Sequence, residues 1–289
     1  MEKYIIGVDL GGTNIRVGLV FCNKVIKKVE VKTEPDKGKT IVIKNLVKAI
    51  SRVMIKNVAG SGIGSPGPLD YRKGFIIRTK NIPLERVNLK KILEKKFNVP
   101  VLVDNDADCF ALGEAVYGAG KKFDAVVGLT IGTGVGGGIV IEKKIFHGRN
   151  DAGELGHTTI DFNGIKCNCG NTGCLEEYVS ARGVMRLAKG LKAKTPLDVY
   201  NLALRGNKKA VNVFKKMGFY LGIAVANFIN IFDPDVIIIG GGISNAWKFF
   251  SKSMKKTVKE RAYVNKNPTI VKSRLRDAAI LGAASLVRE

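Results

Sequence analysis

A histidine and three cysteines with the spacing of metal ligands lie near the middle of the chain: His157, Cys167, Cys169 and Cys174. Neutral imidazole and thiolates are the usual ligands of a closed, four-coordinate zinc site. Gly170 and Gly173 let the chain bend back so that the third thiol can join the other two. Four protein ligands leave no open position for water, so the pattern predicts a structural zinc ion. A disulfide with one spare thiol is the alternative.

Two glycine-rich turns follow apolar segments in different parts of the chain. The first is Gly11-Gly12-Thr13-Asn14 and the second is Gly132-Thr133-Gly134. Glycines leave backbone N–H groups open to a phosphate, although hairpin turns also use glycine for conformational reasons alone. An offset of 121 residues places one turn and its flanking segments on the other. This predicts an internal repeat of two similar halves.

A third glycine run, Gly240-Gly241-Gly242, follows the apolar segment 236–239 and precedes a helical pattern. Bare glycines at such a place let a flat purine or a ribose approach the backbone, and a simple strand-to-helix turn is the alternative. The spacing lacks the G-x-G-x-x-G pattern, and no acidic residue follows about 20 positions later, which excludes a Rossmann dinucleotide site.

Three acidic residues, Asp104, Asp106 and Asp108, follow the apolar segment 99–103. Carboxylates at the end of a strand face the ligand crevice of an α/β sheet. Phosphoryl transfer to a hydroxyl needs such a group to accept the hydroxyl proton. The three residues compete for that role, and Asp108 also suits the first turn of the following helix, where negative charge is favourable.

The segments that position these residues are predicted strands that alternate with predicted helices. This alternation indicates an α/β fold. Apolar runs predict strands over 4–8, 15–21, 58–63, 99–103, 125–129, 136–141 and 236–239. Helical periodicity covers 40–56, 89–97, 107–117, 181–192, 210–232, 246–261 and 277–287.

Composition limits the class of protein. The chain has 289 residues, of which 45% are hydrophobic, so it can bury large cores and is not wholly disordered. Asp9 interrupts the first apolar run, so no signal peptide is expected. The longest uncharged run, 125–141, contains six glycines, which argues against a membrane helix. Five cysteines, three of them clustered, suit a cytoplasmic protein with a metal, and Cys22 and Cys109 are expected to be small buried hydrophobes.

The formal charge of +23 would suit either a nucleic acid or an anionic substrate. The basic residues occur as singles and pairs, without a long basic tail or aromatic-interleaved stripe. A solvated surface is therefore favoured over a dedicated polyanion face, and no specific nucleic-acid partner is expected.

The stretch from His157 through Cys-x-Cys-Gly-x-x-Gly-Cys-x-Glu resembles the signature of the ROK family of repressors and sugar kinases. The likeness extends across nearly the whole chain. It implies an actin-like (ribonuclease H-like) ATPase fold with a central cleft. The implied domains are 1–118 with a returning C-terminal helix, 276–289, and a larger domain, 119–275, that carries the zinc-bearing sugar loop and the nucleotide site.

The resemblance also implies roles for individual residues. The nucleotide residues would be Asp9, Gly11, Gly12, Thr13, Asn14, Gly132, Thr133, Gly134, Gly240, Gly241 and Gly242, with Asp9 holding magnesium through water. The sugar residues would be Gly64, Ser65, Asn81, Asn105, Asp106, Glu154, His157 and Glu176. The family's Asn-Asp pair matches Asn105-Asp106 and selects Asp106 as the general base. Ser65 and Asn81 could equally be ordinary turn residues.

The expected activity is ATP-dependent phosphorylation of the 6-hydroxyl of a hexose, as in the ROK glucokinases, with glucose as the expected sugar. N-acetylmannosamine or another hexose, and polyphosphate as donor, are alternatives. A dimer or tetramer is expected. A sugar-responsive repressor is the non-enzyme alternative. It is disfavoured because the first phosphate segment begins at Gly7, almost at Met1, which leaves no room for the DNA-binding domain that precedes this segment in the repressors.

Overall fold

The computed structural model describes residues 3 to 288, which divide into two compact units. The first unit comprises the chain up to Asp124, Gly138–Gly153, and the chain from Arg274 onward. The second comprises Ala125–Gly137 and Glu154–Ser273.

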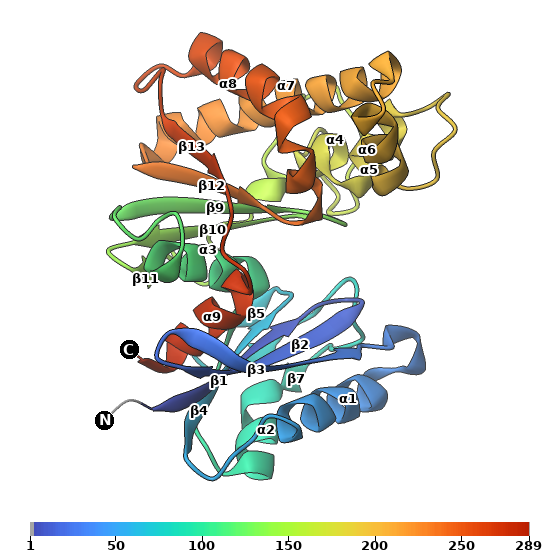
Figure 1. Ribbon diagram of the computed structural model, residues 1–289. Helices are drawn as coiled ribbons and strands as arrows, with labels where there is room; N and C mark the ends of the chain where they lie inside the picture. The colour runs from blue at the N-terminus through green and yellow to red at the C-terminus, as the bar shows by residue number, and fades with distance from the viewer. Residues whose placement is uncertain (1–2, 289) are drawn as a thin grey trace. The chain divides into compact units, whose positions relative to one another are not determined.

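A five-stranded sheet forms the centre of the first unit (Figure 1). Its order is β3 (Lys24–Lys32), β2 (Asn14–Phe21), β1 (Tyr4–Leu10), β4 (Val58–Ser65) and β8 (Val101–Asn105). Strands β1, β4 and β8 run parallel, whereas β2 is antiparallel to both of its neighbours. The carboxyl ends of the three parallel strands therefore meet along one edge of the sheet.

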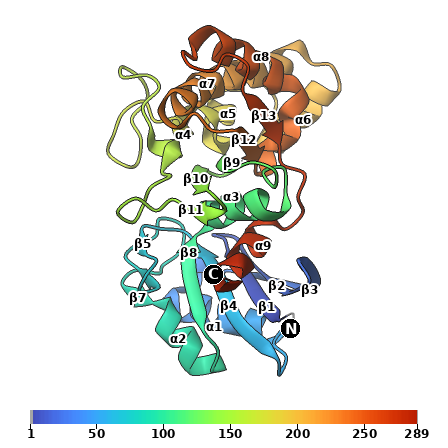
Figure 2. The same ribbon diagram turned by 90° about the vertical axis from the view of Figure 1, so that its left-hand side faces the viewer.

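Alternating side chains of β1 separate the two faces of this sheet. Ile6 and Val8 lie in the core beneath α1 (Lys39–Ser51) and α2 (Leu89–Phe97), whereas Ile5 faces α9 (Ala278–Ser285). Figures 1 and 2 show α1 and α2 on the face opposite α9. Helix α9 approaches β1 so closely that a Cβ on Gly7 would lie 2.0 Å from the carbonyl oxygen of Ile280. A side chain at this position would push the helix off the sheet.

A small sheet of β5 (Leu69–Asp70), β6 (Phe75–Ile76) and β7 (Val87–Asn88) joins β4 to α2. It is not among the elements predicted from the sequence. Strands of two residues are too short to show a periodicity of alternating side chains.

The second sheet repeats the plan of the first. Its order is β11 (Lys144–Ile145), β10 (Val135–Ile141), β9 (Ala125–Ile131), β12 (Val236–Gly240) and β13 (Thr269–Lys272). Adding the offset of 121 to the bounds of β1, 4 and 10, gives 125 and 131, which are the bounds of β9. The predicted internal repeat is confirmed.

Five helices belong to the second unit: α4 (Glu176–Val179), α5 (Ala181–Leu187), α6 (Pro196–Leu204), α7 (Lys208–Phe232) and α8 (Trp247–Arg261). Helices α7 and α8 pack together, and Gly218 of α7 lies against the backbone of Phe250 (Figure 1). A capping box between Thr195 and Asp198, with Pro196 as the first residue of the helix, starts α6. None of the helices in residues 3–288 is long and apolar enough to cross a membrane.

The helix predictions over 89–97, 107–117, 210–232 and 246–261 match α2, α3 (Asp106–Tyr117), α7 and α8 to within two residues at each end. Two predicted helices are too long. Helix α1 ends at Ser51 because the N–H of Arg52 bonds to carbonyls three and two residues back and closes the last turn. Helix α5 ends at Leu187, and Gly190 then takes a φ of +87°, which no helix can continue through.

Candidate functional site

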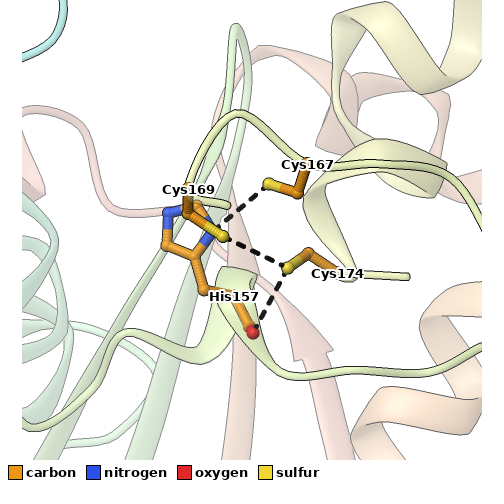
Figure 3. Close-up of side chains that lie close together, drawn as sticks. All are labelled: His157, Cys167, Cys169 and Cys174. Atoms are coloured by element: carbon orange, nitrogen blue, oxygen red, sulfur yellow. Dashed lines mark hydrogen bonds between the residues drawn. The ribbon is translucent and has the colours of Figure 1, made fainter. Parts of the chain in front are cut away.

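The four predicted metal ligands converge on one point. His157 lies in a short 3-10 helix, Leu155–His157, and the cysteines lie on the loop that precedes α4. Their ligand atoms all lie within 4.8 Å of one another (Figure 3). Nδ1 of His157 is 3.7 Å from Sγ of Cys167, and the sulfurs of Cys169 and Cys174 are 3.6 Å apart. A tetrahedral zinc with Zn–S bonds of about 2.3 Å requires ligand separations of about 3.7 Å, so these residues fit zinc.

The thiols are not joined to one another. All five cysteines lie in the described part of the chain, and each is outside a disulfide. A separation of 3.6 Å between two sulfurs is far longer than a disulfide bond of about 2 Å. The disulfide alternative is therefore wrong. Cys109 is buried as predicted, but Cys22 is exposed, because it forms the tight turn between β2 and β3 with a φ of +46°.

Burial keeps two of the ligand thiols protonated while no metal is bound. It raises the pKa of Cys174 to about 12, and it raises the pKa of Cys167 above its ordinary value. A metal must therefore displace protons when it binds.

Glu176 connects the metal loop to the second glycine turn. It is the first residue of α4, and its Oε2 accepts the backbone N–H of Val135 at 3.0 Å. Its other oxygen accepts a bond from Arg182 at 3.1 Å, and Arg182 also bonds to the buried Glu177. A second link follows at Ala181, whose N–H donates to the carbonyl of Gly132 at 2.8 Å. The metal loop and the glycine turn are thus one hydrogen-bonded structure.

The third glycine run lies against the end of β9, the strand that leads into the second glycine turn. Gly241 has a φ of +81°, and a Cβ there would lie 2.4 Å from the carbonyl oxygen of Ile131, the last residue of β9. Only glycine allows this approach. The second unit therefore brings together Gly132-Thr133-Gly134, Gly240-Gly241-Gly242 and Glu176.

The first unit brings its predicted residues together at the carboxyl edge of its sheet. Asp9 pairs with Gly64 across β1 and β4. Gly64 pairs in turn with Asp104, and Ser65 pairs with Asn105, across β4 and β8. The segments predicted to bind phosphate, to bind sugar and to supply the general base thus lie side by side at the ends of three neighbouring strands.

The first glycine turn closes over Asn81. A Cβ on Gly12 would lie 3.2 Å from the Cβ of Asn81. The turn itself is held by a bond from the N–H of Gly11 to the carbonyl of Asn14 at 3.1 Å, and by Thr33, whose hydroxyl donates to the carbonyl of Gly11 at 2.6 Å.

Asp9 is a partly buried carboxylate at the mouth of this turn. Its side chain is 19% exposed and bonds to Arg16 at 3.2 Å. Burial raises the pKa of Asp9 above its ordinary value, and Arg16 opposes this effect without cancelling it. A carboxylate of this kind gains from a nearby cation, which suits the proposed interaction with hydrated magnesium.

Asn105 caps helix α3. Its side-chain oxygen accepts the backbone N–H of Ala107 at 2.8 Å and that of Asp108 at 3.4 Å. Asp106 is the first residue of the helix, half-buried, and its Oδ1 accepts the N–H of Ala107 at 2.9 Å. The strand end and the capped helix thus fix the backbone on both sides of Asp106. Asp108 is buried in the first turn of the helix.

His147 contacts the strand end that carries the candidate site, and the sequence did not predict this contact. Its Nε2 is 2.8 Å from Oδ2 of Asp104, the residue that ends the buried part of β8. The two residues are 43 positions apart, and nothing in the local sequence of either indicates the other.

A model of the ROK family matches residues 5–289, nearly the whole chain. The chain belongs to the ROK family. The glucokinase of Thermotoga maritima is 38% identical to it, over 99% of this chain and 97% of that protein. The xylose repressor of Caldicellulosiruptor bescii is 33% identical, over 98% of this chain and 77% of that protein.

A solved ROK structure is similar over the same length. The crystal structure of a ROK family glucokinase from Streptomyces griseus, in complex with glucose and AMPPNP, has a TM-score of 0.87 at 30% identity, over 99% of each chain. The α/β fold predicted from the alternation of strands and helices is confirmed, and the two sheets of matching order agree with the actin-like fold that the ROK resemblance implied.

Proposed function

We propose that the protein phosphorylates the 6-hydroxyl of a hexose, with ATP as donor and glucose as the preferred sugar. The observation that carries this proposal is the row of paired residues at the carboxyl edge of the first sheet. Asp9 pairs with Gly64, Ser65 pairs with Asn105, and Asp106 directly follows Asn105. The similarity to glucokinases over nearly the whole chain supports glucose as the sugar.

In this proposal Asp106 accepts the proton of the 6-hydroxyl while that oxygen attacks the γ-phosphorus and ADP leaves. Most of the acceleration would come from positioning and from stabilisation of charge on the phosphoryl oxygens. Backbone N–H groups of the two glycine turns would bind the phosphates, and Gly240-Gly241-Gly242 would accommodate the adenosine. Magnesium would neutralise phosphate charge beside Asp9.

Glucose would be held by Gly64, Ser65, Asn81 and Asn105 on the first unit and by Glu154, His157 and Glu176 on the second. Charge-assisted bonds from hydroxyls to carboxylates discriminate among epimers. Because Nδ1 of His157 faces the thiols, Nε2 is the nitrogen left for a sugar hydroxyl. The proposed domains are 1–118 with 276–289, and 119–275.

The metal is proposed to be zinc with a structural role. It would order the loop that carries His157 and precedes Glu176. We further expect a cytoplasmic protein, because clustered free thiols suit a reducing compartment. A homo-oligomer, a dimer or a tetramer, is expected from the ROK relationship alone.

The test is a coupled assay of ADP formation with ATP and a panel of hexoses that includes glucose, mannose, fructose, allose and N-acetylmannosamine, repeated with polyphosphate as donor. Turnover highest on glucose with ATP supports the proposal. Turnover confined to N-acetylmannosamine would show that the proposed sugar is wrong, and turnover confined to polyphosphate would show that the proposed donor is wrong. Sugar binding without turnover on any member would favour the repressor alternative, which the similarity to a xylose repressor keeps in view.

A further inference from the structure

Asp104 is a deeply buried carboxylate directly before the proposed catalytic pair. Its side chain is only 6% exposed. A carboxylate removed from water needs hydrogen-bond donors, because a buried charge without them is strongly unfavourable. Oδ1 of Asp104 accepts the backbone N–H of Asn105 at 2.8 Å, and Oδ2 is 2.8 Å from Nε2 of His147. His147 therefore satisfies the oxygen that the strand end does not.

The imidazole of His147 is fixed in plane and in direction. It lies face to face on the ring of Tyr71, with ring centroids 3.6 Å apart and planes 5° apart. An ionised carboxylate has no proton to give, so Nε2 is the donor and carries the hydrogen. Arg72 also approaches the Tyr71 ring, 4.7 Å from its centroid. The stacking sets the plane of the imidazole, and the carboxylate sets its rotation within that plane.

Backbone bonds hold the segment around His147 in the first unit. The N–H of Phe146 donates to the carbonyl of Ile139 at 2.8 Å, and the N–H of Ala152 donates to the carbonyl of His147 at 3.1 Å. The side chain of Asn150 donates to the carbonyl of Leu69, the first residue of β5, and Tyr71 directly follows that strand. These hydrogen bonds hold the loop in the position from which His147 contacts Asp104.

We propose that His147 is a positioning residue for phosphoryl transfer, which acts by holding Asp104 and thereby the end of β8 from which Asn105 and Asp106 follow. This inference rests on the proposed function. A general base must be held within a fraction of an ångström of its productive position, and small displacements lower the rate strongly. Loss of the His147 donor leaves the buried carboxylate of Asp104, two residues before Asp106, without one of its hydrogen bonds. Movement of that carboxylate would shift the end of β8.

The test compares His147→Leu, which removes the donor, with His147→Gln, whose side-chain amide can still donate to Asp104. We expect His147→Leu to lower kcat by about tenfold or more, with the KM for ATP within about threefold of wild type. His147→Gln should recover most of kcat. Rates are measured well below the melting temperature of each variant and are normalised to folded protein.

Glu94→Leu is the matched control. Glu94 accepts the backbone N–H of Val101 at 3.1 Å, at the opposite end of the same strand. This variant should lower the melting temperature while leaving kcat near the wild-type value. If folded His147→Leu keeps kcat within about twofold of wild type, or if His147→Gln loses as much as His147→Leu, the positioning role is wrong. A wild-type protein without turnover on any sugar would instead overturn the proposed function and this inference with it.

Discussion

Glu176 accepts the backbone N–H of Val135 at 3.0 Å, so the residue that follows the metal loop also holds the turn proposed to bind phosphate. The two residues are 41 positions apart in the chain. A change in the metal loop can therefore reach the glycine turn through one carboxylate.

Glu176→Ala is expected to weaken nucleotide binding as well as sugar binding. Hydrogen bonds to a charged acceptor contribute about 1.5–3 kcal/mol, so loss of the bond to Val135 predicts a rise of about tenfold or more in the KM for ATP. Steady-state kinetics with each substrate varied in turn would measure both values. Glu176→Gln, which keeps an acceptor oxygen, should have a smaller effect on ATP. An unchanged KM for ATP in folded Glu176→Ala would contradict the coupling.

Asp106→Asn should abolish turnover while sugar binding is retained. A general base supplies a factor of about 100 or more in rate, and asparagine keeps the shape of the side chain and the N-terminal turn of α3. The measurement is kcat together with the dissociation constant for glucose by calorimetry. Retention of more than about a tenth of the wild-type kcat would assign the proton to another group.

Metal removal should lower the melting temperature and the sugar affinity together. The four ligand atoms lie within 4.8 Å of one another, so without the ion their loop loses its central support. Chelation, with metal loss verified by elemental analysis, followed by thermal unfolding and glucose titration, would measure both. Unchanged stability in verified metal-free protein would contradict the structural role.

Metal affinity should fall as the pH falls. The pKa of Cys174 is about 12, and the pKa of Cys167 is also raised by burial, so both thiols are protonated at neutral pH in the metal-free protein. Each displaced proton adds one unit to the slope of log affinity against pH, which predicts a slope of about two or more. Competition against a chromophoric chelator over a range of pH would give the slope, and a pH-independent affinity would show that the thiols are already ionised.

Asp9→Asn should raise the melting temperature at neutral pH and abolish activity. Folding raises the pKa of Asp9 above its ordinary value of 3.8, so the ionised carboxylate is less favourable in the fold than in the unfolded chain. That penalty is present above the folded-state pKa and vanishes below the unfolded value. The gain in melting temperature should therefore disappear in acid. A variant that melts lower than wild type at neutral pH would show that the bond to Arg16 outweighs burial.

The sequence predicted the metal ligands and most of the long elements, for physical reasons, but it did not predict β3, β11, β13, α4 or α6. Helix α2 has the predicted bounds because its apolar positions recur at helical spacing. The metal ligands could be recognised because three of the four lie within eight residues, from Cys167 to Cys174, and only a few residue types bind zinc.

Contacts between distant segments could not be predicted in this way. The bond between His147 and Asp104, and that between Glu176 and Val135, depend on how strands and loops come together in the fold. Nothing in the sequence near His147 indicates its partner, because Asp104 lies 43 residues away on β8. The small sheet of β5, β6 and β7 was missed because two-residue strands carry no pattern.

Phosphorus and carbon NMR of the reaction product would test the central claim most directly. Wild-type, metal-loaded protein is incubated with glucose, ATP and magnesium. The account predicts one phosphate ester, on the oxygen of carbon 6 of the sugar, formed in equal amount to ADP. An ester at another carbon, or ADP formed without any sugar ester, would contradict it.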